Sequence, residues 1–62
     1  MSNSAEIEQL EKDIIRIQGQ IREAHTIPCL TLRAISLRYL NVLKGRALAR
    51  MAILLREQEK QN

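Results

Sequence analysis

The 62-residue chain contains no phenylalanine, no tryptophan and a single tyrosine, so aliphatic side chains must form most of any core. Its one cysteine, Cys29, excludes an internal disulfide, and one cysteine with one histidine provides too few ligands for a structural metal. A chain of this length buries only about 60% of the surface that its unfolded form exposes. Small folds usually compensate with disulfides, a metal or association. Since the first two are excluded, the composition predicts association.

Helix-breaking residues are also scarce, with one proline and two glycines. The commonest residues are Ala, Leu, Ile, Arg, Glu and Gln, which favour helix. The first four residues lack the basic and apolar regions of a secretory signal peptide. Charged residues recur from Arg33 to Arg56, so no transmembrane segment is expected. Together with the unpaired cysteine, these features predict a soluble, cytoplasmic protein.

A three-four spacing of apolar residues predicts a first helix over about 4–24. The spacing forms a narrow seam of the coiled-coil type, and Ile15 falls outside it. Asn3 or Ser4 is expected to cap this helix, whose first turns carry acidic residues that complement the helix dipole. The seam consists of Ile7, Leu10, Ile14, Ile17 and Ile21.

Pro28 predicts a turn, because proline disfavours a helical conformation of the residue before it and suits the first turn of a new helix. We therefore expect a turn over about 25–28 and a second helix over about 28–58. Gly45 is expected to weaken this helix without ending it. The chain 1–62 is thus predicted to be one all-α domain, an antiparallel two-helix hairpin whose second helix is the longer.

The second helix is apolar on two sides, whereas the first has a single seam. A helix that is apolar nearly all round is normally buried, and one neighbouring helix covers only one side of it. The broad stripe consists of Leu30, Leu37, Leu40, Leu43, Ala47, Leu48, Met51, Leu54 and Leu55, and the second, roughly opposite, of Ile35, Tyr39, Val42 and Ile53.

The short turn places Ile14 near Arg38 and Ile7 near Arg46, so the first helix is expected to reach only about Arg50. Residues 51–55 would then project beyond it and need cover from a second copy or another protein. A homodimer that forms a four-helix bundle is the simplest closed arrangement. The predicted protein interface consists of Leu40, Leu43, Ala47, Met51, Leu54 and Leu55.

Acidic residues are absent between Ala24 and Arg56, a region that holds six basic residues. Part of this charge is expected to complement the acids of the first helix. Clustered basic residues also neutralise phosphates, although these form no single stripe and lack interleaved aromatics for base stacking. An acidic membrane surface or a calmodulin-like target is a further alternative. The residues assigned to possible RNA or DNA contact are Arg38, Arg46, Arg50 and Arg56.

Catalytic and metal-binding patterns are weak. His25 and Cys29 flank the predicted turn, and two ligands are too few for zinc unless a dimer supplies four. As a Cys–His pair they lack a third orienting group, and Cys29 is expected to be a small buried side chain. The sequence therefore predicts a non-enzymatic interaction protein without a cofactor, which self-associates or docks as a helical subunit, adaptor or inhibitor. A nucleic-acid-binding regulator is the alternative, and the sequence leaves open which partner is bound.

Overall fold

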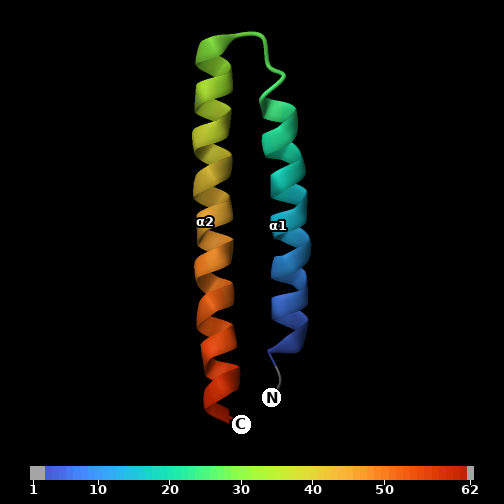
Figure 1. The fold of residues 1–62 in the computed structure, drawn as a ribbon, viewed down its shortest axis with the longest axis vertical. Helices are drawn as coiled ribbons and strands as arrows, with labels where there is room; N and C mark the ends of the chain where they lie inside the picture. Colours follow the sequence, from blue (N-terminus) through green and yellow to red (C-terminus); the bar gives the residue numbers. More distant parts are fainter. Residues whose placement is uncertain (1–2, 62) are drawn as a thin grey trace.

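The computed structural model describes residues 3–61 and consists of two α-helices that pack side by side (Figure 1). Helix α1 spans Ser4–Ala24 and helix α2 spans Leu30–Gln61. They run antiparallel and form a rod whose Cα atoms extend over 49 × 14 × 11 Å. The prediction of an all-α two-helix hairpin is confirmed. A four-helix bundle concerns association between chains, which a single chain does not test.

Helix α1 begins after Asn3, whose carbonyl accepts a hydrogen bond from the Ile7 N–H at 2.9 Å. The Asn3 side chain makes no capping hydrogen bond and instead reaches α2. At the other end, the Thr26 hydroxyl donates to the Glu23 carbonyl at 2.6 Å, and the His25 N–H donates to the Ile21 carbonyl at 3.2 Å. These bonds satisfy carbonyls that a helix end leaves without intrahelical partners.

The turn covers residues 25–29, and Pro28 lies before α2 instead of in its first turn. Because Pro28 fixes its own φ and disfavours a helical Ile27, the chain does not continue α1 into α2. The Cys29 carbonyl accepts the first hydrogen bond of α2, from the Arg33 N–H at 2.9 Å. Helix α2 therefore starts two residues later than expected, at Leu30.

The register of the two helices differs from the expected one by about one helical turn. Glu6 contacts Arg50, and Asn3 contacts Glu57, whereas the sequence pattern placed Arg46 near Ile7, the neighbour of Glu6, and Arg50 at the start of the first helix. The longer turn allows α1 to lie further along α2. Asn3 and the first turn of α1 therefore lie beside α2 as far as Glu57, and Leu54 is buried, so the expectation that residues 51–55 project beyond the first helix is wrong.

The core is one aliphatic seam between the helices. Leu54, on α2, is the most deeply buried large side chain, with 1% of its surface exposed. Burying an aliphatic side chain contributes about 1.5–3 kcal/mol, so the few buried side chains carry most of the hydrophobic stabilisation. From α1 the buried residues are Ile7, Ile14, Ile17 and Ala24.

Candidate interaction surface

Five of the six residues predicted to form a partner interface contribute instead to the contact with α1. Leu54 is buried, and four others are partly buried: Leu40, Leu43, Ala47 and Met51. Leu55 differs, since 44% of its surface is exposed. Helix α1 thus occupies most of the surface that the sequence pattern assigned to a partner, because the shifted register extends the helix–helix contact along α2.

The second apolar side of α2 is exposed in the hairpin. Tyr39 and Ile35 are the most exposed of its residues, at 63% and 60%, and Val42 is the least, at 47%. Leu32, three residues before Ile35, extends this side by one position, and its spacing could have identified it from the sequence. The four residues from Leu32 to Val42 recur at the three-four spacing of a helix–helix seam, and Ile53 follows eleven residues later on the same side. We call this set the outer stripe: Leu32, Ile35, Tyr39, Val42 and Ile53.

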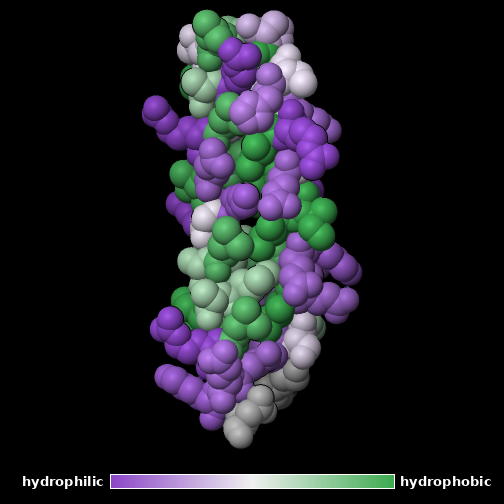
Figure 2. Space-filling model, in the orientation of Figure 1, coloured by the Kyte–Doolittle hydropathy of each residue, from purple (hydrophilic) through white to green (hydrophobic). Residues whose placement is uncertain are grey.

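Exposed large apolar residues are concentrated on α2. Besides the outer stripe, this helix exposes Leu30, Leu48 and Leu55, whereas Ile15 is the one such residue within Ser4–Ala24. Figure 2 shows one face of the rod, on which hydrophobic side chains gather along the seam between the helices and hydrophilic side chains project from both edges. Exposed apolar side chains that gather on one side of a small protein often mark an interaction site. Most of the exposed large apolar residues of the described chain therefore lie on α2.

Two open grooves adjoin the outer stripe, and Tyr39 and Leu43 line both of them. The larger groove, of about 670 Å³, lies between α1 and α2, where Arg16 and Glu23 form part of its wall. The smaller, of about 370 Å³, lies on α2 and includes Ile35 and Val42. The two grooves therefore adjoin each other at Tyr39 and Leu43.

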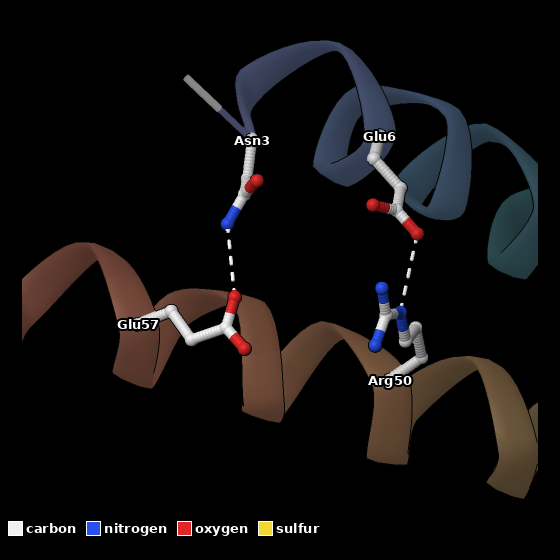
Figure 3. A network of polar contacts seen from close by, with 4 residues as sticks. All are labelled: Asn3, Glu6, Arg50 and Glu57. Carbon is white, nitrogen blue, oxygen red and sulfur yellow. Dashed lines mark hydrogen bonds and ion pairs between the residues drawn. The ribbon is translucent and has the colours of Figure 1, made fainter. Parts of the chain in front are cut away.

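Polar contacts across the helices occur near the N-terminus of α1 (Figure 3). Arg50 Nε donates to Glu6 Oε1 at 3.1 Å, and Asn3 Nδ2 donates to Glu57 Oε2 at 3.2 Å. Both contacts are exposed to solvent. They specify which residues of α2 lie opposite the N-terminal end of α1. The contact with Glu6 also pairs Arg50 within the chain.

Replacing Glu6 with glutamine is expected to change the free energy of unfolding by less than about 1 kcal/mol, because exposed ion pairs contribute little. Urea unfolding followed by circular dichroism measures this change. A loss of several kcal/mol would show that the Glu6–Arg50 pair contributes far more than its exposure indicates. Asp13 paired with Arg16 within α1 offers a control, since Asp13→Asn removes an ion pair that does not join the two helices.

The remaining arginines assigned to nucleic-acid contact differ from Arg50. Among residues 3–61, Arg38, Arg46 and Arg56 have no carboxylate oxygen within 4.0 Å. Arg38 and Arg46 line the smaller groove beside Tyr39. The structure therefore brings two uncompensated positive charges to the edge of the outer stripe and directs Arg50 toward α1.

The turn carries no assembled chemical site. His25 and Cys29 are both exposed, so the expectation of a buried Cys29 is wrong. In the part of the chain that the structure describes, no group of three or more His, Cys, Asp or Glu residues is placed to hold a metal ion. Neither described helix combines the length and apolar character needed to cross a membrane.

Comparison of the chain with models of protein families, with curated proteins and with solved structures finds no match.

Proposed function

We propose that the protein is a small, non-enzymatic interaction protein that self-associates or docks as a helical subunit on another protein. Association through the outer stripe would use the side of α2 that α1 leaves uncovered. Two hairpins joined in this way contain four helices, with the α2 helices in contact and the α1 helices outside. The exposed thiol of Cys29 suits a reducing compartment such as the cytoplasm.

The outer stripe is the observation that carries this proposal. Four of its five large side chains follow helix–helix spacing, yet each of the five leaves 47–63% of its surface in water. Full burial of such side chains contributes about 1.5–3 kcal/mol each, and a partner would recover much of it. A hairpin with one thin seam has little stability of its own, so association through this stripe would also stabilise the fold.

The nucleic-acid alternative has less support. Arg50, one of the four arginines assigned to it, is already paired with Glu6. Arg38 and Arg46 flank an aliphatic groove that contains one aromatic residue, Tyr39. Single-stranded nucleic acid is usually held by several stacking aromatics along a basic track, and this surface provides one ring.

Replacing Ile35 and Val42 together with glutamine tests the proposal. We expect the double variant to remain helical as a dilute monomer, because both side chains are largely exposed in the hairpin. We also expect it to lose association, measured by sedimentation and light scattering for the chain alone. Circular dichroism of dilute samples reports folding separately from association.

Leu40→Gln provides the matched control, since Leu40 lies partly buried against α1 and should be required for folding itself. If Ile35→Gln/Val42→Gln lost as much helicity as Leu40→Gln in dilute solution, the outer stripe would belong to the folding core. That result would contradict the proposed function regardless of which partner is bound.

A further inference from the structure

We draw no further inference here: the strongest candidate, the apolar surface patch that the outer stripe forms on the exposed side of α2, belongs to the site already described, and nothing in the structure shows what covers it.

Discussion

Replacing Ile14 with aspartate is expected to unfold the hairpin, whereas the same change at the adjacent Ile15 should leave it folded. Ile14 is 9% exposed in the seam with α2, and Ile15 is 68% exposed on the outside of α1. An unpaired carboxylate in a buried site costs several kcal/mol or forces the group to become neutral. A fold of this size rarely has more than about 3–5 kcal/mol available from its core. The expected loss at Ile14 is therefore comparable with the whole stability of the chain.

The two aspartate variants control for each other. Both replace isoleucine in the middle of α1, so the change in intrinsic helix propensity and in net charge is the same. Far-ultraviolet circular dichroism at low protein concentration should show a large loss of helicity for Ile14→Asp and a small one for Ile15→Asp. Equal losses would mean that the seam is not the contact that holds the helices together.

Truncating Leu54 to alanine is expected to lower the free energy of unfolding by about 2–5 kcal/mol, the range for large-to-small changes in a packed core. Leu54 has 1% of its surface exposed, so the change removes fully buried methyl groups and leaves a cavity at the end of the hairpin remote from the turn. Urea or thermal unfolding measures the loss. The wild-type chain should be examined at a concentration where it has one association state, since dimerisation would raise its apparent stability.

Leu55→Ala is the matched control for this prediction. Leu55 is the adjacent leucine on the same helix and is 44% exposed, so its truncation should cost much less in a dilute monomer. A similar loss in the two variants would indicate that the end of α2 is packed differently from the arrangement described above. A smaller loss for Leu54→Ala than for Leu55→Ala would contradict the register that places α1 beside residues 51–57.

The first helix and the hairpin could be predicted because their determinants are local. A regular seam from Ile7 to Ile21 specifies a helix with one buried side, and Pro28 marks the break before the second helix. The register could not be predicted, since it depends on the path of the turn. In the structure α2 begins at Leu30 instead of Pro28, and the register differs from the expected one by about one helical turn. The seam contains few large buried side chains, so their packing favours one register over its neighbours only weakly.

The candidate surface could be predicted in part. The sequence identified two apolar sides of α2, but both contain aliphatic residues at helical spacing, and periodicity does not say which side α1 covers. The structure resolves this through contacts between residues far apart in the chain, such as Glu6 with Arg50. Burial of Leu54 and exposure of Tyr39 follow from that pairing, and neither is a property of α2 alone.

The antiparallel path of the chain also determines how the rod can be tethered. Asn3 and Glu57 are in contact, so the two described ends of the chain lie at the same end of the rod (Figure 1). A linker fused to either end would emerge there, and it would leave the bend at residues 25–29 and the long flank of α2 unobstructed. Attachment through the exposed Cys29 thiol, in the turn at the opposite end of the rod, would leave the two described ends of the chain free instead. The hairpin can therefore be immobilised by either end of the rod without a change to its helix faces.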